Sequence, residues 1–366
     1  MNLRLAVVLE QALAPVPGGI GRYAVELAAA LAIDGGVTSW TAWHRDTTAA
    51  CVPGVARPTR LPLGHRTLTL AWQYGLGPGP RDADVVLAPS ILAPPRRRTP
   101  LLVVVHDAVP WTHPEVLTPR GVRFHRAMGE RLAATADAVL TPTAAAAAAL
   151  ARHLPDLEGR IHVVGAGVSA AAVTPPPDAE GRATRLALPP SYLLVVASLE
   201  PRKGLDVAIR ALADPAAPDL PLLVAGPVGW GSVNLPGMAA AQGLAPERVR
   251  ALGRLDDADL ATVLGRATVL VAPSRAEGFG LPVAEAMAAG VPVVSSDDPA
   301  LLETGGGATR TVPVGDASAL AAALREVVAD SGLRERMVVA GRLRAAAHDW
   351  HRVAAGVRAV AASVRA

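Results

Sequence analysis

The chain has 366 residues, of which 51% are hydrophobic and 18% charged, and its formal net charge is +3. At about 150 residues per domain, this length predicts two domains, and the apolar content excludes a mainly disordered chain. No basic run is interleaved with aromatic residues, which argues against nucleic acid as a partner. Because only 3% of the residues are aromatic, Ala, Val and Leu must fill the cores.

The mean hydropathy of +0.32 raises the question of a membrane span. Arg, Asp, Pro or Gly interrupts every apolar run before the ~18 residues that a spanning helix needs. The start of the chain lacks the apolar core of a signal peptide, and the one cysteine, Cys51, forbids an internal disulfide. We therefore expect a cytoplasmic protein whose contact with the inner face of the membrane is at most peripheral.

Short apolar runs alternate with helix-period segments, which is the pattern of an α/β protein with parallel sheets. In the first half, strands are predicted at 3–9, 37–43, 85–87, 101–105, 138–140 and 161–164, with helices at 23–33, 121–135 and 144–153. A Gly- and Pro-rich stretch at 165–190 predicts a linker. After it, strands are predicted at 192–197, 222–225, 249–252, 269–271, 291–295 and 310–313, with helices at 205–212, 256–265, 281–289 and 317–328. Residues 331–366 are typical of almost continuous helix.

The segment from Ser274 to Met287 combines a glycine-bearing turn with the start of a helix. Pro282 fits the first helical turn, so the amides of residues 278–281 should face the carboxyl end of a strand and suit a phosphate or another oxygen-rich group. Glu277 in the loop and Glu285 in the helix can both face one crevice and accept hydroxyl protons from a ribose and a sugar. Taken singly, Glu285 also fits a helix-dipole role, and Glu277 a solvated loop charge.

Two further segments lie where predicted strands end. Arg202 and Lys203, the only lysine of the chain, precede a helix, and such a pair can clamp a diphosphate. The pair is unfavourable for the helix dipole, which favours a functional role. His106-Asp107 follows another strand, at the edge where parallel sheets bind ligands. The alternative there is a capping Asp beside a bystander His.

A glycine-rich run, Pro17 to Ala24, opens the first predicted helix and matches the dinucleotide pattern G-x-G-x-x-A from Gly19. About nine residues separate it from the first strand, whereas the dinucleotide turn is tight. We interpret the run as a flexible loop whose backbone can approach a phosphate. No spacing typical of a metal site occurs among the His, Cys and Asp residues, so no metal is predicted.

A basic helical stretch carries Arg120, Arg123, Arg126 and Arg131, with three arginines at 96–98 upstream. It fits either a face that touches an anionic membrane or a solvated surface.

Taken together, these segments resemble the retaining GT-B glycosyltransferases of family 4, and they fall in the family's order over nearly the whole chain. The resemblance is carried by the E-x7-E pair Glu277 and Glu285, the glycine loop Gly18–Gly21, Leu199-Glu200-Pro201-Arg202-Lys203, and His106-Asp107. It implies two Rossmann-like domains facing a central cleft: an acceptor domain over 1–170 and a nucleotide-sugar domain over 171–348. A helix over 349–366 would pack back on the first domain.

The resemblance also implies site residues. Arg202 and Lys203 would bind the donor diphosphate, and His106 and Glu277 would contact the donor sugar. The donor-binding residues would be Gly19, Ser198, Gly278, Phe279, Gly280, Leu281 and Glu285. It further implies no cofactor and no metal, a nucleotide-sugar donor as co-substrate, and a glycan or lipid-linked acceptor. The motifs look most like those of bacterial mannosyltransferases, which makes GDP-mannose the expected donor.

The chain departs from many relatives at two places. It has Gly165-Ala166-Gly167 where they have Pro-Asn-Gly, and Lys203-Gly204 where they have Lys-Asn. The alternatives to transfer are a nucleotide-sugar epimerase, which needs no acceptor, an NAD-dependent dehydrogenase, and a sugar-nucleotide-binding protein without turnover.

Overall fold

Short buried runs of Val, Leu and Ala form the strands of two parallel sheets in the computed structural model of the chain, which describes residues 3–231 and 233–365. The chain divides into two units. The first takes the chain up to Pro114, then Pro119–Gly167, and finally everything from Asp349 onward. The second takes Glu115–Thr118 and Val168–His348. The expected boundary was residue 170, three residues beyond Gly167.

In the described part of the chain, the first unit contains a seven-stranded sheet in the order β3-β2-β1-β4-β5-β6-β7, with every neighbouring pair parallel. The strands are β1 (Leu5–Val8), β2 (Val37–Trp43), β3 (Thr59–Gly64), β4 (Val85–Ala88), β5 (Leu101–Val104), β6 (Ala138–Thr141) and β7 (Ile161–Val163). The α-helices are α1 (Gly18–Ala32), α2 (His65–Gln73), α3 (Val109–Thr112), α4 (Pro119–Thr135), α5 (Ala144–His153) and α15 (Trp350–Arg365), and a short 3₁₀ helix, η1, spans Glu10–Leu13.

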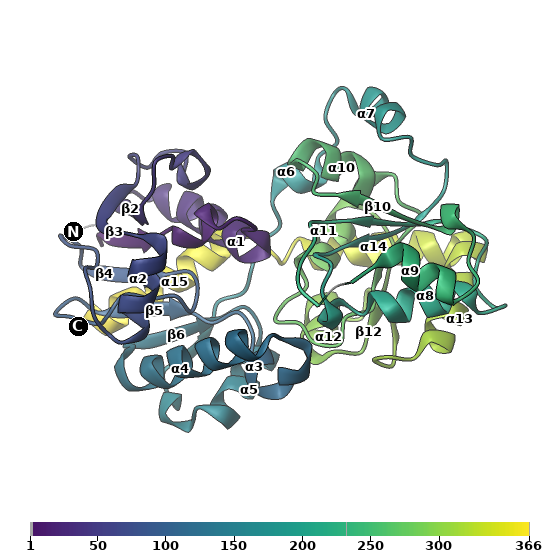
Figure 1. Cartoon of the computed structure of the whole chain (residues 1–366). Coiled ribbons are helices and arrows are strands. Elements are labelled where there is room, and N and C mark those ends of the chain that lie inside the picture. Colours follow the sequence, from purple (N-terminus) through teal and green to yellow (C-terminus); the bar gives the residue numbers. More distant parts are fainter. Residues whose placement is uncertain (1–2, 232, 366) are drawn as a thin grey trace. The chain divides into compact units, whose positions relative to one another are not determined.

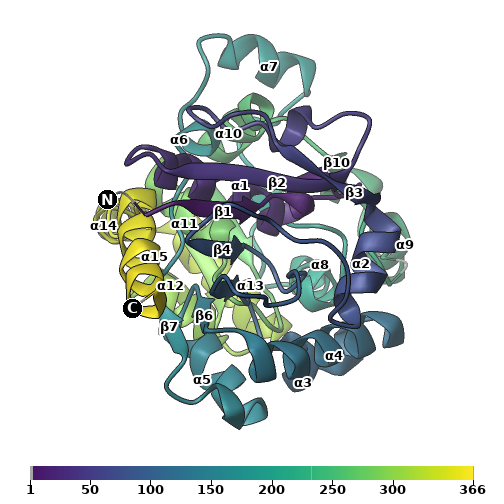
Figure 2. The ribbon, with the colours of Figure 1, turned by 90° about the vertical axis from the view of Figure 1, so that its left-hand side faces the viewer.

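Alternate residues of these strands face one core of the first unit. Val8 and Val103 lie there with Trp72 of α2 and Leu132 of α4, all of them almost fully buried. Burying each such apolar side chain stabilises the fold by about 1.5–3 kcal/mol. Figure 2 shows the sheet of this unit, with β2, β1 and β4 following one another in that order.

The last helix, α15, returns to the first unit, as the sequence predicted. It packs against α1, and Val353 and Val357 of α15 are buried. Nη2 of Arg358 donates to the carbonyl oxygens of Leu31 and Gly35, at 2.6 and 2.7 Å. In Figure 1 this yellow helix lies among purple and blue elements, which come from the early part of the sequence. The core of the first unit therefore includes residues from both ends of the described chain.

The second unit contains, within the described residues, a six-stranded parallel sheet in the order β10-β9-β8-β11-β12-β13. The strands are β8 (Leu193–Val196), β9 (Leu222–Ala225), β10 (Val249–Gly253), β11 (Val269–Ala272), β12 (Val293–Ser296) and β13 (Arg310–Val312). The α-helices are α6 (Ala170–Val173), α7 (Ala179–Arg185), α8 (Leu205–Ala213), α9 (Leu235–Ala241), α10 (Asp257–Gly265), α11 (Leu281–Ala289), α12 (Pro299–Gly305), α13 (Ala317–Ala329) and α14 (Ser331–Ala345).

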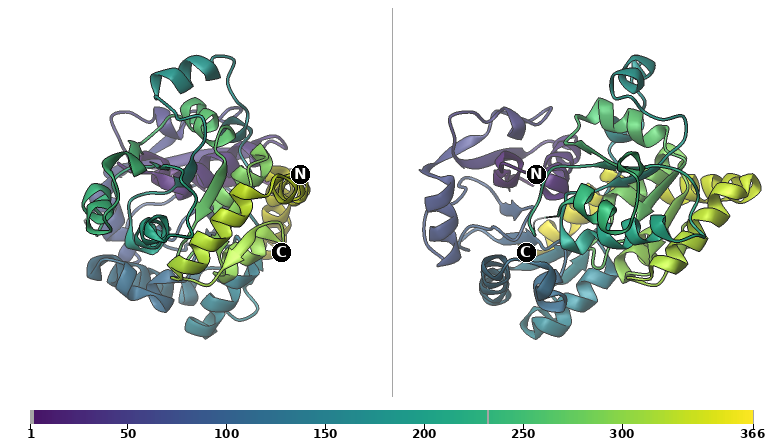
Figure 3. Two further views of the ribbon diagram at one scale, coloured as in Figure 1. Left: turned by 90° about the vertical axis from the view of Figure 1, so that its right-hand side faces the viewer. Right: turned by 45° about the vertical axis from the view of Figure 1, so that its right-hand side comes forward.

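Successive residues of these strands enter opposite cores, because side chains alternate across a strand. Leu193 and Val195 of β8 lie in the core that α8 and α13 cover. Leu194, between them, lies in the core that α10 and α11 cover. Figure 3 turns this unit toward the viewer, with its green strands between helices. Continuous apolar strands are what a sheet covered on both faces requires.

Besides the short excursion at Glu115–Thr118, the chain passes between the units at 167–168 and at 348–349. The N–H of Val168 donates to the carbonyl of His348 at 3.0 Å, which joins the two passages. This crossing ends α14 and separates it from α15, so the tail is two helices where the sequence predicted one nearly continuous helix. Gly167 must be glycine here, since a Cβ would lie 2.5 Å from Cγ of Trp350.

The structure corrects three other predictions. The stretch at 165–190 is not only a linker, because it contains α6 and α7. Strand β3 was missed because it is an edge strand with mostly exposed residues and an internal Pro62, so it lacks an apolar run. Helix α1 begins at Gly18, so the run read as a flexible loop forms its first turn.

Candidate active site

The loop between β11 and α11 is shaped by one glycine and one proline. Gly280 caps the helix with a φ of +90°, and a Cβ there would lie 2.4 Å from Cδ2 of Leu301. Pro282 stands in the first turn of α11, as predicted. Thr304 Oγ1 donates to the carbonyl of Phe279 at 2.6 Å and fixes the loop. The first turn of α11 therefore points its N–H groups toward the carboxyl end of the sheet.

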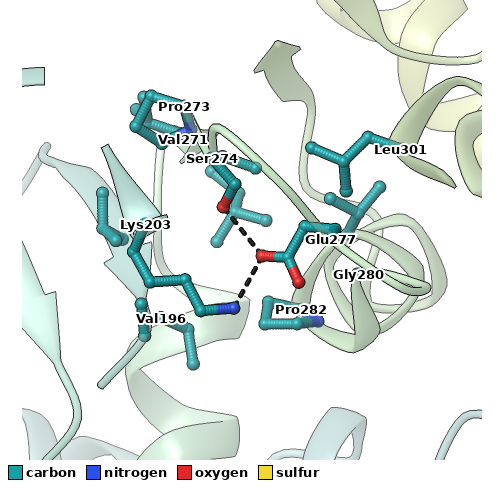
Figure 4. Close-up of a pocket in the computed structure, with 14 residues that line it drawn as sticks. Val196, Lys203, Val271, Pro273, Ser274, Glu277, Gly280, Pro282 and Leu301 are labelled. Carbon is teal, nitrogen blue, oxygen red and sulfur yellow. Dashed lines mark hydrogen bonds and ion pairs between the residues drawn. The ribbon is translucent and has the colours of Figure 1, made fainter. Parts of the chain in front are cut away.

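Glu277 is the centre of the charged cluster in this loop. Its Oε1 accepts from Lys203 Nζ at 2.6 Å and from Ser274 Oγ at 2.7 Å. Arg202 Nη1 lies 3.4 Å from Oε2 of the same carboxylate. Figure 4 shows Lys203 and Ser274 both directed at Glu277 inside a pocket of the second unit. Two loops that lie 74 residues apart in sequence thus meet at one carboxylate.

The cations come from the loop between β8 and α8. Glu200, which is 6% exposed, accepts from Arg202 Nε at 3.1 Å and from Ser198 Oγ at 2.5 Å. Gly204 ends the loop with a φ of +65°, and a Cβ there would lie 2.0 Å from the carbonyl oxygen of Pro273. The absence of a side chain at Gly204 therefore lets the two loops touch, which positions both cations.

The cluster perturbs its own ionisation. Burial alone would raise the pKa of Glu277, but Lys203 and Arg202 outweigh it and lower that pKa to about 2. Burial, followed by the neighbouring Arg202, lowers the pKa of Lys203, while Glu277 opposes both effects. Glu277 is therefore an ionised carboxylate at neutral pH, held in a nearly dry position.

Asp298 is a site residue that the sequence reading missed. Its Oδ2 accepts the N–H of Glu277 at 3.3 Å, and its Oδ1 caps α12 by accepting from Ala300 and Leu301. Burial raises its pKa to about 6, and the nearby Glu277 adds to that effect. An Asp followed by a Pro marks the start of a helix, so the sequence alone could have identified Asp298 as a helix cap.

Glu285 lies in the second turn of helix α11, which spans Leu281–Ala289. It is 3% exposed on α11 and is not among the residues that line the pocket around Glu277. Gly280, which lines that pocket, was among the predicted residues. Ser198 is linked to the cluster through its hydrogen bond to Glu200.

The remaining predicted residues belong to the first unit. His106 follows β5, and its Nε2 lies 2.8 Å from the carbonyl oxygen of Pro89, while its ring packs edge-on against Tyr23 of α1 at 4.7 Å. Burial lowers the pKa of His106, so its ring is neutral with the proton on Nε2. Asp107 accepts the N–H of Val109 at 3.0 Å, which is the capping role weighed above. Gly19 lies in the first turn of α1.

The basic helical stretch is α4, and only part of it is a solvated face. Arg126 Nε donates to the carbonyl of Pro110, and Arg131 Nη2 to that of Ala93, at 2.9 and 2.8 Å. Arg120 and Arg123 are exposed. Among residues 3–231 and 233–365, no helix combines the length and the apolar character needed to cross a membrane.

Two family models match successive parts of the chain: residues 178–344 match "Glycosyl transferases group 1", and residues 17–172 match "Glycosyltransferase Family 4". A phosphatidyl-myo-inositol mannosyltransferase of Mycobacterium leprae is 39% identical over 166 residues, which are 44% of this chain and 43% of that protein. A D-inositol 3-phosphate glycosyltransferase of Streptomyces avermitilis is 34% identical over 243 residues, 62% of this chain and 52% of that protein. The match spans about half the length of these relatives.

The fold also matches solved structures. Sucrose-phosphate synthase from Thermosynechococcus elongatus aligns with a TM-score of 0.76 over 99% of each chain, at 22% identity. Two parallel-sheet α/β units of this kind form the GT-B fold, which is the class of these solved structures. Within that class, the chain belongs to the glycosyltransferases of the group 1 and family 4 type.

Proposed function

We propose that this protein transfers a hexose from a nucleotide-sugar, with GDP-mannose as the donor, to a glycan or lipid-linked acceptor, retaining the anomeric configuration and using no metal in the transfer. The observation that carries the proposal is the cluster of Lys203, Arg202 and Glu277, which places two cations and an ionised carboxylate at the carboxyl end of one sheet. Donors of this class bring a diphosphate and sugar hydroxyls, which such groups bind.

The transfer reaction requires stabilisation of the negative charge that develops on the leaving diphosphate. Breaking the anomeric bond leaves negative charge on the diphosphate while the sugar becomes cation-like. Arg202 and Lys203 would stabilise the leaving diphosphate, so a metal ion is not needed for that task. Both cations are already desolvated and oriented, by Glu200 and Glu277, before the donor arrives. Little reorganisation would then accompany the reaction.

The other predicted residues take their roles under the same proposal. Glu277 and the amides of 279–281 hold the sugar hydroxyls, and Glu285 binds the ribose. Gly19 approaches the phosphate. Nδ1 of His106 accepts a hydrogen bond from a hydroxyl group of the donor sugar, because the proton on Nε2 is directed to the carbonyl of Pro89.

The names of two relatives support mannose as the transferred sugar and a lipid-linked acceptor. The relative from Mycobacterium leprae is called a mannosyltransferase acting on phosphatidyl-myo-inositol, and the one from Streptomyces avermitilis a glycosyltransferase acting on D-inositol 3-phosphate. Both of the acceptors in these names contain an inositol ring, and the first is a lipid. We therefore propose phosphatidylinositol as the first acceptor to test.

The test begins with thermal unfolding in the presence of GDP-, UDP- and ADP-sugars, since a bound donor raises stability by mass action. The stabilising donor is then incubated with acceptor, and the product's anomeric configuration is read by NMR. Acceptor-dependent release of nucleotide supports transfer. Release of free nucleotide without acceptor would identify an epimerase, and stabilisation without turnover a binding protein. Turnover that rises with added Mg²⁺ or Mn²⁺ would contradict metal-free transfer.

A further inference from the structure

Three side chains that the proposed function does not use meet at the carboxyl edge of the first sheet. Glu10 follows β1, His44 follows β2, and His65 begins α2 directly after β3. The strands β1, β2 and β3 are neighbours in the sheet and run parallel, so the residues that follow them are brought to one edge. The three residues are far apart in sequence, by 34 and 55 positions from Glu10.

The three side chains converge on one oxygen atom. Oε1 of Glu10 lies 2.8 Å from Nε2 of His44 and 2.6 Å from Nδ1 of His65. One ligand-type atom from each residue lies within 4.8 Å of the other two. The second oxygen, Oε2, accepts the N–H of Ala42 at 2.7 Å, which fixes the carboxylate from behind. A backbone donor of this kind is the outer support that orients metal ligands in proteins.

Burial distinguishes this group from an ordinary surface cluster. The Glu10 side chain is 2% exposed, whereas those of His44 and His65 are 21% and 42% exposed. The carboxylate is thus held in the protein, and the two imidazoles form the side that solvent reaches. An ion can approach from that side, and both rings can adjust when it binds.

We propose that Glu10, His44 and His65 form a zinc site, with a fourth position open to water or to an oxygen of a bound ligand. Two imidazoles and a carboxylate suit Zn²⁺ and, as a probe, Co²⁺, whereas Mg²⁺ prefers oxygen ligands. Zinc lies about 2.0–2.2 Å from such atoms, so tetrahedral ligands are about 3.3 Å apart. The distances from Oε1 to His44 and His65, 2.8 and 2.6 Å, need to lengthen by about 0.5 and about 0.7 Å, which side-chain rotation provides.

Binding changes the protons at the rings. In the hydrogen-bonded arrangement, the ring nitrogens that face Glu10 carry protons. A ring nitrogen that ligates zinc gives its proton to solvent or carries it on the other ring nitrogen. The same three atoms that make these hydrogen bonds thus become the ligands when zinc binds. The site shares no residue with the donor cluster, so it stands whether or not the proposed function holds.

The experiment is equilibrium dialysis of the full chain, with any affinity tag removed, against ZnCl₂, followed by elemental analysis. We expect one zinc per chain, and visible absorption of tetrahedral type when Co²⁺ replaces it. His65→Ala should weaken zinc affinity at least about tenfold, because one of three ligands is lost. Glu10→Gln should do the same. His65→Ala is the safer variant, since His65 is the most exposed of the three and its loss spares the fold.

The matched control is His153→Ala, since His153 is an exposed histidine at the end of α5, outside the cluster. It should leave zinc affinity unchanged. Circular dichroism of each variant checks the fold. Absence of bound zinc in the wild-type chain, or equal affinity in His65→Ala and the control, would overturn the proposal. Mg²⁺ competing with zinc at equal concentration would also contradict the predicted ligand set.

Discussion

The Nζ atom of Lys203 lies 2.6 Å from Oε1 of Glu277, and both side chains are nearly removed from solvent, with 13% and 11% of their surface exposed. An ion pair in such a position differs from one on the surface. Each charge has lost most of its hydration, so removing one partner leaves the other uncompensated. This pair therefore connects the stability of the second unit with the chemistry proposed for it.

Replacing Lys203 by Met should lower both stability and turnover. The lost partner leaves Glu277 with Arg202 and Ser274, and we expect the free energy of unfolding to fall by about 2 kcal/mol. Under the proposed function, turnover should fall about a hundredfold, since one of the two groups on the diphosphate is lost. Chemical denaturation and a transfer assay measure the two effects.

The control is Arg310→Met, which breaks the half-exposed ion pair with Glu326 and should lower the free energy of unfolding by less than about 1 kcal/mol. Near-normal turnover in Lys203→Met would remove Lys203 from the donor site.

Gly204→Ala should be far more damaging than an ordinary glycine substitution. The residue has a positive φ, and its new Cβ would meet the backbone oxygen of Pro273, which cannot move without separating the two site loops. We expect a loss of at least about 3 kcal/mol in the free energy of unfolding. The control is Gly315→Ala, where φ is +83° and the new Cβ would lie more than 4 Å from every described residue except its chain neighbours, so only the backbone cost of about 1 kcal/mol applies. Equal losses in the two variants would show that the close approach is absent.

Asp298 gives the second unit a specific pH dependence. Its pKa is raised from an ordinary 3.8 to about 6, so between these values the native state binds more protons than the unfolded chain. The free energy of unfolding should therefore contain a contribution that decreases as the pH rises through this window. Asp298→Asn keeps a cap acceptor and removes the titration. Relative to wild type, the variant should gain about 2 kcal/mol between about pH 4 and about pH 7 in urea unfolding.

The matched control for this pH experiment is Asp316→Asn. Asp316 also caps a helix, α13, by accepting the N–H of Ala319 at 2.9 Å, but it is exposed. Its substitution should change the stability by a similar amount at about pH 5 and about pH 7. A parallel offset for Asp298→Asn as well would mean that the buried carboxyl does not carry the predicted dependence.

Val357→Ala tests the return of α15 to the first unit. Val357 is fully buried against that unit, and removing two methyl groups should cost about 2 kcal/mol in the free energy of unfolding. Val339→Ala on α14 serves as the comparison, since that side chain is 70% exposed and should change stability by less than about 0.5 kcal/mol. An equally small effect at Val357 would place α15 outside the core.

Much of the fold could be predicted because its strands are buried on both faces. Runs such as Leu193–Val196 and Leu101–Val104 are continuously apolar, and the helices between them have a clear period. Strand β3 escaped because an edge strand needs no such run. The helical pattern of 331–366 did not reveal the break between α14 and α15, because the Val168 to His348 hydrogen bond beside it joins residues far apart in sequence. Only the resemblance to a family implied a boundary there, at 348.

The candidate site divides in the same way. Arg202, Lys203 and Glu277 could be found because each lies in a local strand–loop–helix context. Their mutual contacts, and the support from Glu200, needed the structure. Glu10, His44 and His65 could not be found from spacing, since only the order of β1, β2 and β3 in the sheet brings them together.

The first unit is interrupted in sequence by the second, because Asp349 and the residues after it belong with Pro119–Gly167. The second unit is continuous from Val168 to His348, apart from the short piece Glu115–Thr118. In the order of synthesis, α15 comes after the whole of Val168–His348, yet it packs against α1, which comes before that segment. We therefore expect the second unit to complete its core before the first, which needs the sixteen residues of α15 to complete its own.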